Sequence, residues 1–132
     1  MIAHTLALCA SLLASPAEGR TCSCVAAVSD ADAVARSEVV FVGRALRSRT
    51  VVARQGWRMR VSTFAVTRWR KGGRQDQVEV QTGMTGADCG IVFRRGRTYT
   101  VYGRHTAEGR VSTGLCDVPL ESRMPTGPRG SR

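Results

Sequence analysis

Asparagine is absent from this chain of 132 residues, and Lys71 is its only lysine. The other 19 of its 20 cationic residues are arginine, a bias that a GC-rich coding sequence would produce. Acidic side chains are also scarce: only ten occur, which leaves a formal net charge of +10. Codon usage does not explain that excess of cations, so the charge itself points to acidic partners.

Long apolar runs are scarce as well. The chain is long enough for one ordinary domain and too short for a (β/α)₈ barrel or a two-domain dinucleotide enzyme. A hydrophobic content of 42% excludes a wholly disordered chain. The longest apolar run, residues 5–14, has about half of the ~20 residues that a membrane-spanning helix needs. We therefore expect no transmembrane segment in the mature chain.

The first 19 residues predict a secretory signal peptide. Their apolar run is followed by Ser15, Ala17 and Gly19, so cleavage after Ala17 or after Gly19 satisfies the small-x-small rule. The segment contains no lysine or arginine, and a buried N-terminal helix or strand is the alternative. We expect a secreted or periplasmic protein with a folded domain over residues 20–117 and a flexible basic tail over 118–132.

Removal of that segment leaves 113 residues, a charge of +11 and the four cysteines Cys22, Cys24, Cys89 and Cys116. An even number in a small exported domain predicts two disulfides. A Cys22–Cys24 bridge would close a very small, strained ring, so each of these residues is expected to pair with a distant cysteine, in either of two arrangements. A zinc site is the alternative, but structural zinc usually uses C-x₂₋₄-C pairs rather than C-x-C.

Local patterns predict a short helix followed by five strands. Ser29 precedes acidic residues and Arg36 lies near the end of the same segment, the charge order that a helix prefers. The strands predicted from β-branched runs cover residues 38–47, 57–69, 77–82, 97–103 and 111–115. Polar loops are expected at 48–56 and 83–90. The apolar alternation slips within 57–69, which predicts a β-bulge or a bend.

Five short strands with one bent member favour a small all-β barrel or sandwich. Closure into a barrel would remove the exposed sheet edges. The interior would draw on apolar side chains of the predicted strands. The expected core residues are Val39, Phe41, Val61, Phe64, Val66, Val78, Val80, Tyr99 and Val101.

The order of the motifs resembles the netrin-like domain, and more narrowly the bacterial relatives of the tissue inhibitors of metalloproteinases. The motifs are C-S-C at Cys22, the following helix, V-V-F-V-G-R at 39–44, V-T-R-W-R-K-G-G at 66–73, D-C-G-I-V-F-R-R-G-R-T-Y-T-V-Y at 88–102 and S-T-G-L-C at 112–116. Together they span about Cys22 to Cys116. The resemblance implies a five-stranded OB-fold barrel with Cys22–Cys89 and Cys24–Cys116 disulfides.

The resemblance also implies an activity. In the animal inhibitors the α-amine and carbonyl of the first cysteine chelate the catalytic zinc of a metalloproteinase. Here that role would fall to Cys22, within an inhibitory segment made of Cys22, Ser23, Cys24 and Val25. The chemistry requires Cys22 to be the first residue of the mature chain, whereas the expected cleavage sites leave residues ahead of it. The partner implied is a zinc metalloproteinase or another extracellular protein.

A second function class is the binding of acidic polymers. Acidic glycans, the envelope surface and nucleic acid are candidate ligands, because OB barrels bind nucleic acid in basic grooves. The alternative is a solvated basic surface without a ligand. The candidate basic patch consists of Arg44, Arg47, Arg58, Arg60, Arg68, Arg70, Lys71, Arg94 and Arg95.

Catalysis is not expected. His105 is the only histidine after the signal peptide, and we interpret it as a surface residue at a strand end. Disulfide-bonded cysteines would leave no Cys–His pair, and the remaining serines and carboxylates form no recognisable catalytic set. We expect a monomer without a cofactor and without a metal of its own.

Overall fold

The computed structural model describes residues 22–25, 27–84 and 86–123, so the predicted signal peptide (1–19) lies outside the described residues. Strands are the main secondary structure of the described fold. They are β1 (Val39–Val52), β2 (Arg58–Lys71), β3 (Gln77–Gly83), β4 (Thr98–His105) and β5 (Val111–Ser112). The helical elements are α1 (Asp30–Arg36), the 3₁₀ turn η1 (Gly86–Asp88) and α2 (Leu120–Arg123).

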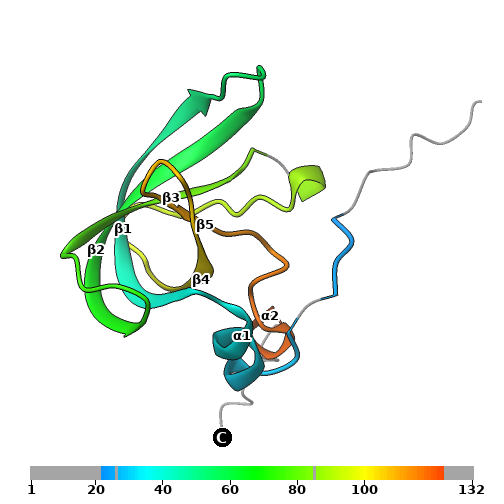
Figure 1. Cartoon of the computed structure of the whole chain (residues 1–132), viewed down its shortest axis with the longest axis vertical. Helices are drawn as coiled ribbons and strands as arrows, with labels where there is room; N and C mark the ends of the chain where they lie inside the picture. The colour runs from blue at the N-terminus through cyan, green and yellow to red at the C-terminus, as the bar shows by residue number, and fades with distance from the viewer. Residues whose placement is uncertain (1–21, 26, 85, 124–132) are drawn as a thin grey trace, which may run out of the picture.

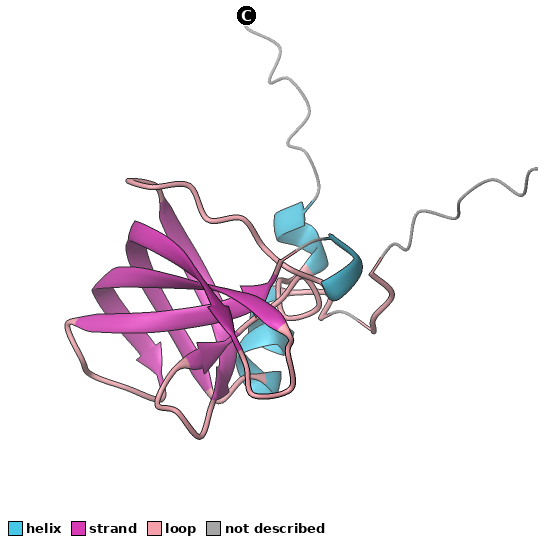
Figure 2. Ribbon diagram, turned by 90° about the horizontal axis from the view of Figure 1, so that it is seen from above, coloured by secondary structure: helices cyan, strands magenta, loops and turns pink. Residues whose placement is uncertain are grey.

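The five strands pair in a closed ring in the order β1-β2-β3-β5-β4. β1 pairs antiparallel with β2 and with β4, and β2 pairs antiparallel with β3. The short β5 completes the ring, parallel to β3 and antiparallel to β4. The strands wrap around a common interior, and α1 and α2 lie together at one end (Figures 1 and 2). The mainly β architecture and the short first helix are confirmed.

Helix α1 forms where its charge order predicts it. The Ser29 hydroxyl accepts a hydrogen bond from the Asp32 backbone N–H at 3.2 Å, which caps the first turn. Ser37 ends the helix in an extended conformation, and its N–H donates to the Ala33 carbonyl. The buried Ala33 packs with Val40 and Tyr102, so one face of α1 rests against β1 and β4.

The β1–β2 hairpin contains three register shifts. Two of them leave an extra residue on β2, at Thr67 and at Arg70, and the third leaves Leu46 as an extra residue on β1, opposite the step from Thr63 to Phe64. The bulge predicted within 57–69 is therefore confirmed at Thr67. Where the apolar alternation of β2 slips, between Val61 and Phe64, all four residues are buried and the extra residue lies on the partner strand.

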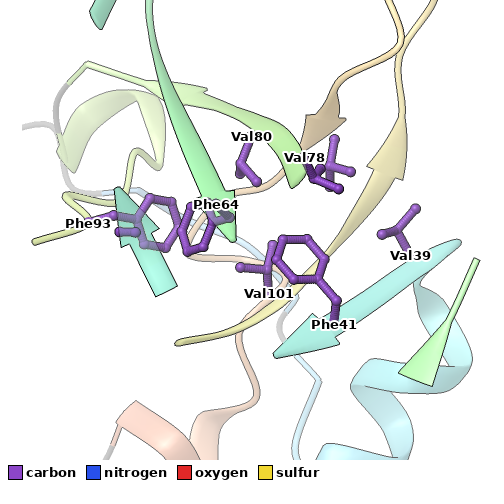
Figure 3. Packing of buried hydrophobic residues seen from close by; sticks show 9 residues of the cluster. Val39, Phe41, Phe64, Val78, Val80, Phe93 and Val101 are labelled. Atoms are coloured by element: carbon purple, nitrogen blue, oxygen red, sulfur yellow. The ribbon is translucent and has the colours of Figure 1, made fainter. Parts of the chain in front are cut away.

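Three phenylalanines from different parts of the chain form the centre of the core (Figure 3). The Phe64 ring lies edge-on to Phe41 and Phe93, with ring centroids 5.7 and 5.0 Å away. Seven of the nine predicted core residues are buried, while Val66 and Tyr99 are partly buried against the cluster. Phe93 and Val111 are core residues that the strand patterns did not predict.

Three expected boundaries are wrong. The loop expected at 48–56 is shorter, because Thr50, Val51 and Val52 continue the ladder with β2. The last strand ends at Ser112 rather than at residue 115. The tail expected from residue 118 does not begin there, since Pro119 is fully buried and α2 follows it. The rest of the expected tail, residues 124–132, lies outside the described residues.

Phe64→Ala should lower the free energy of unfolding by about 3–5 kcal/mol, because it leaves a cavity between two aromatic rings in the centre of the core. Urea denaturation at neutral pH measures the change. Val92→Ala is the control, because Val92 is 67% exposed and should change stability by less than about 0.5 kcal/mol. Equal effects of the two substitutions would contradict this assignment of the core.

Candidate functional site at the disulfide-tethered segment

Two disulfides fasten the first described residues to the rest of the fold. Cys22 pairs with Cys89 and Cys24 with Cys116, across Cα–Cα distances of 5.0 and 5.6 Å. Both pairings implied by the family resemblance are formed. The Cys116 sulfur lies 3.6 Å from that of Cys22 and 3.7 Å from that of Cys89, so the two bridges pack against each other. Sulfurs joined in this way are not available as thiolate ligands for zinc.

The segment Cys22–Val25 carries the four residues predicted as an inhibitory segment. Cys22 is half-buried, whereas Ser23, Cys24 and Val25 are exposed, and 87% of Val25 is accessible to solvent. None of the four belongs to a helix or a strand. The Arg36 guanidinium donates to the Val25 carbonyl at 3.3 Å, so a side chain of α1 holds the end of the segment. The result is an exposed stretch of chain that is fixed at three of its four residues.

The loop that contains Cys89 is held by backbone hydrogen bonds as well as by the disulfide to Cys22. Cys89 has a φ of 56°, a left-handed conformation that is uncommon for a residue with a side chain. Its N–H donates to the Gly86 carbonyl at 3.2 Å, and its carbonyl accepts from the Leu115 N–H at 2.8 Å. The exposed turn η1 therefore lies beside the tethered segment on a supported backbone.

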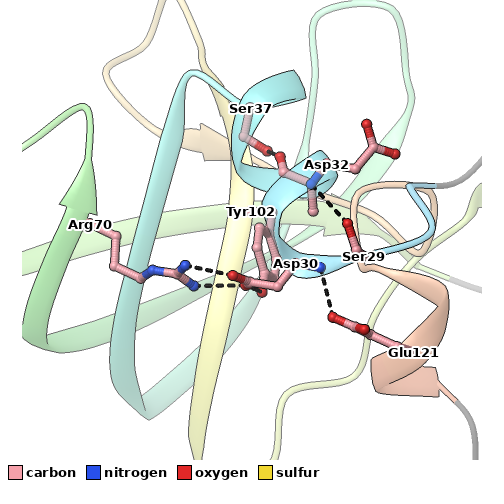
Figure 4. Close-up of polar contacts among 8 residues, drawn as sticks. Ser29, Asp30, Asp32, Ser37, Arg70, Tyr102 and Glu121 are labelled. Carbon is pink, nitrogen blue, oxygen red and sulfur yellow. Dashed lines mark hydrogen bonds and ion pairs between the residues drawn. The ribbon is translucent and has the colours of Figure 1, made fainter.

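Asp30 joins α1 to the strands and to the second helix (Figure 4). Its carboxylate accepts two hydrogen bonds from the Arg70 guanidinium, at 2.7 and 2.8 Å, and one from the Tyr102 hydroxyl. Its backbone N–H donates to the Glu121 carboxylate at 2.7 Å. Asp30 thus links α1 to β2, β4 and α2, just after the tethered segment in the chain.

The same contacts shift two pKa values in opposite directions. Hydrogen bonds from Arg70 first, and then from Tyr102, hold the pKa of Asp30 well below its usual range. Burial, together with the neighbouring Asp30 carboxylate, raises the pKa of Tyr102 to about 12. At neutral pH the arrangement is therefore a charged carboxylate–guanidinium pair capped by a neutral phenol.

Helix α2 is hydrogen-bonded to the chain that follows the segment Cys22–Val25. The Leu120 N–H donates to the Ala27 carbonyl at 2.8 Å, and the Glu121 N–H donates to the Val28 carbonyl at 3.3 Å. The chain between the disulfides and α1 is therefore held by backbone bonds as well as by sulfur. Composition does not reveal α2, because the surrounding prolines and glycines favour a flexible tail.

The structure divides the predicted basic patch. Arg44, Arg47 and Arg95 line one hollow of about 400 Å³, because the turn at 94–97 hydrogen-bonds to β1 at Ala45. Arg70 is paired with Asp30, and the Lys71 ammonium donates to the Val34 carbonyl at 2.9 Å, so both serve to hold α1.

The remaining predicted cations do not line that hollow. Arg58 begins β2, Arg68 and Arg94 are exposed, and His105 is an exposed residue at the end of β4. The Nη1 atom of Arg60 is buried and has no hydrogen-bond partner among the described residues. Three of the nine predicted cations therefore line the hollow, two hold α1, and the other four do not line it.

The comparisons with known proteins leave the family assignment as a prediction. No model of a protein family matches the chain, and a search of curated proteins finds no match. Across residues 22–25, 27–84 and 86–123, no helix has both the length and the apolar character required to cross a membrane.

Asp30→Asn should lower the free energy of unfolding by about 1 kcal/mol at pH 7. The neutral amide keeps an acceptor for Tyr102 but loses the ion pair, and Asp30 is 43% exposed, so solvent screening limits the effect. A carboxyl whose pKa is lowered by folding stabilises the fold above its unfolded pKa of about 3.9 and loses that contribution as the pH falls further. The difference between Asp30→Asn and the parent should therefore shrink below about pH 4.

Denaturant unfolding between pH 3 and pH 7 measures this difference. Asp76→Asn is the matched control, because the side chain of Asp76 has no ion pair or hydrogen bond among the described residues. A pH-independent difference for Asp30→Asn would contradict the assigned ion pair.

Proposed function

We propose that this chain is an exported netrin-like OB-fold module that binds an extracellular zinc metalloproteinase in the manner of the tissue inhibitors. The observation that supports this most directly is the tethered segment Cys22–Val25, which is exposed yet anchored by both disulfides and by Arg36. The ring of five strands with one parallel pair is compatible with an OB barrel.

The geometry suits a segment that enters a protease cleft. A chain that is already fixed in an extended, accessible form loses little conformational entropy when it binds. The α-amine and carbonyl of Cys22 would supply the ligands for the target's zinc, while Ser23 and Val25 would contact the surrounding subsites. An amide nitrogen is a poor zinc ligand, so binding requires a second cleavage that makes Cys22 the first residue.

Inhibition should depend on the residue at the amino terminus. We expect a chain that begins at Cys22 to inhibit a zinc metalloproteinase at least 100-fold more strongly than one that begins at Arg20, because only the former presents a free amine. Hydrolysis of a fluorogenic peptide by a panel of zinc metalloproteinases measures this. The Cys22 chain with an acetylated amine is the matched control.

Sequencing of the amino terminus of the exported protein shows which form exists. Equal inhibition by the free, acetylated and extended chains would contradict chelation through Cys22. A natural chain that begins at Arg20 would contradict the proposed role in the cell.

A second candidate function, the binding of acidic polymers, is favoured by the hollow that Arg44, Arg47 and Arg95 line. All three are exposed, and none has an ion pair among the described residues. Arginines that line one hollow suit sulfate or phosphate groups, which accept paired hydrogen bonds from guanidinium groups. This candidate does not require any particular amino terminus.

Binding to heparin or to DNA should weaken steeply as salt is added. Arg44→Gln with Arg95→Gln should reduce the slope of log affinity against log salt for DNA by roughly 1.5 to 2, since two phosphate contacts are lost. Arg74→Gln with Arg104→Gln is the control, because it removes the same charge from two exposed arginines outside the hollow. Equal losses for the two pairs would show that net charge, rather than the hollow, drives binding.

A further inference from the structure

The β1–β2 hairpin ends in a compact turn that we name the hairpin tip, residues 52–58. The Ala53 N–H donates to the Trp57 carbonyl at 2.8 Å, and the Gly56 N–H donates to the Ala53 carbonyl at 2.9 Å. Gly56 has a φ of +82°, which residues with side chains rarely adopt, so glycine is required to close the turn. The turn is therefore an ordered structure that holds the two strand ends together.

Two large apolar side chains are exposed at the hairpin tip. Val52 is 61% exposed and Trp57 is 69% exposed, and they are separated only by the turn. Trp69, by contrast, packs against Phe41 and donates its indole N–H to the Gln75 carbonyl at 2.8 Å. Neither exposed side chain has a role in the core, and an amphipathic ring such as the Trp57 indole suits the boundary between water and lipid.

Uncompensated positive charge surrounds these apolar side chains. Residues 39–75 contain ten cations and no aspartate or glutamate. Arg54 and Arg58 of the hairpin tip are exposed and have no ion pair among the described residues, whereas Arg49 is bound to Glu79 at 2.9 Å. The tip therefore combines apolar insertion groups with free guanidinium groups.

The hairpin tip extends beyond the paired part of the sheet (Figure 1), and one side of it shares a hollow with Glu108 and Arg110, between β4 and β5. β4 pairs with β1 only as far as Arg44, and β3 pairs with β2 only from Met59 onward. Beyond those points β1 and β2 pair only with each other. A flat surface could therefore approach Val52 and Trp57 without meeting another strand.

We propose that the hairpin tip docks this protein onto an anionic lipid bilayer. Trp57 and Val52 enter the headgroup region, and Arg54 and Arg58 pair with anionic headgroups. Nucleic acid would require a row of stacking aromatics, whereas Trp69, Tyr99 and Tyr102 are engaged in the fold. An acidic glycan would use the arginines but not the apolar pair. The proposal does not rest on protease inhibition, because the tip shares no residue with Cys22–Val25.

Vesicle binding tests the proposal with the oxidised chain that lacks residues 1–19. We expect it to cosediment with phosphatidylcholine vesicles that contain phosphatidylglycerol, and not with pure phosphatidylcholine. Its tryptophan emission should shift to the blue as Trp57 leaves water. Arg54→Gln with Arg58→Gln should weaken binding roughly 25-fold, at about fivefold for each arginine.

Val52→Ser with Trp57→Ser should weaken binding at least tenfold and abolish the emission shift. Val28→Ser with Val92→Ser is the matched control, because both valines are 67% exposed and lie outside the tip. Arg74→Gln with Arg104→Gln controls for net charge. Both control chains should bind like the parent.

Three results would overturn the proposal. The first is binding to heparin or DNA without binding to anionic vesicles. The second is full vesicle binding by the Val52→Ser, Trp57→Ser chain, which would leave charge alone as the cause. The third is a loss of vesicle binding in the two control chains that equals the loss in the hairpin-tip variants. Protease inhibition measured on the same variants should stay unchanged, so failure here and failure of the inhibitor proposal are distinguishable.

Discussion

The two packed disulfides are the constraint on which the first part of the molecule depends. The segment Cys22–Val25 has no strand or helix of its own, and among the described residues its one hydrogen bond that does not involve sulfur is from Arg36 to the Val25 carbonyl. The bridges close loops of 67 and 92 residues, and each contributes about 4 kcal/mol in the chain-entropy model, although overlapping loops do not add. The consequence is that an exposed segment is held in one position, which lowers the entropy it loses on binding a partner.

Other interactions hold the chain on both sides of the disulfide-tethered segment. Cys89 carries a left-handed backbone that its bonds to Gly86 and Leu115 maintain. On the other side, Asp30 and α2 hold the chain that leaves the segment, through Arg70, Tyr102 and Glu121. The disulfides therefore hold the start of the chain between Cys22 and α1, and the Asp30 cluster holds its end. Loss of either would release only that part of the chain.

Local sequence predicted more of the fold than of the site. The helix at Ser29, the presence of all five strands and most of the core follow from capping, β-branched runs and periodicity, which are properties of neighbouring residues. Phe93 was missed because arginines and glycines surround it, and only closure of the ring brings it against Phe64. Arg70 and Tyr102 follow Asp30 by 40 and 72 residues in the chain, so no local spacing indicates that the three side chains meet.

The distribution of acids, rather than the number of cations, decides what the charge can do. Asp30, Asp32 and Glu121 gather around α1 and α2, while Glu79 binds Arg49 and Arg110. The hairpin contains no acid of its own, and the distal half of β1 lies beyond its pairing with β4.

Interactions between exposed charges fade over about 8 Å at physiological salt, so the acids near α1 cannot compensate arginines at the far end of the hairpin. Arginine side chains also protect an unpaired strand edge from joining another sheet, which gives the residues of distal β1 a structural role besides binding. The net charge of +10 is thus a local property of one hairpin, and a test of its function belongs there.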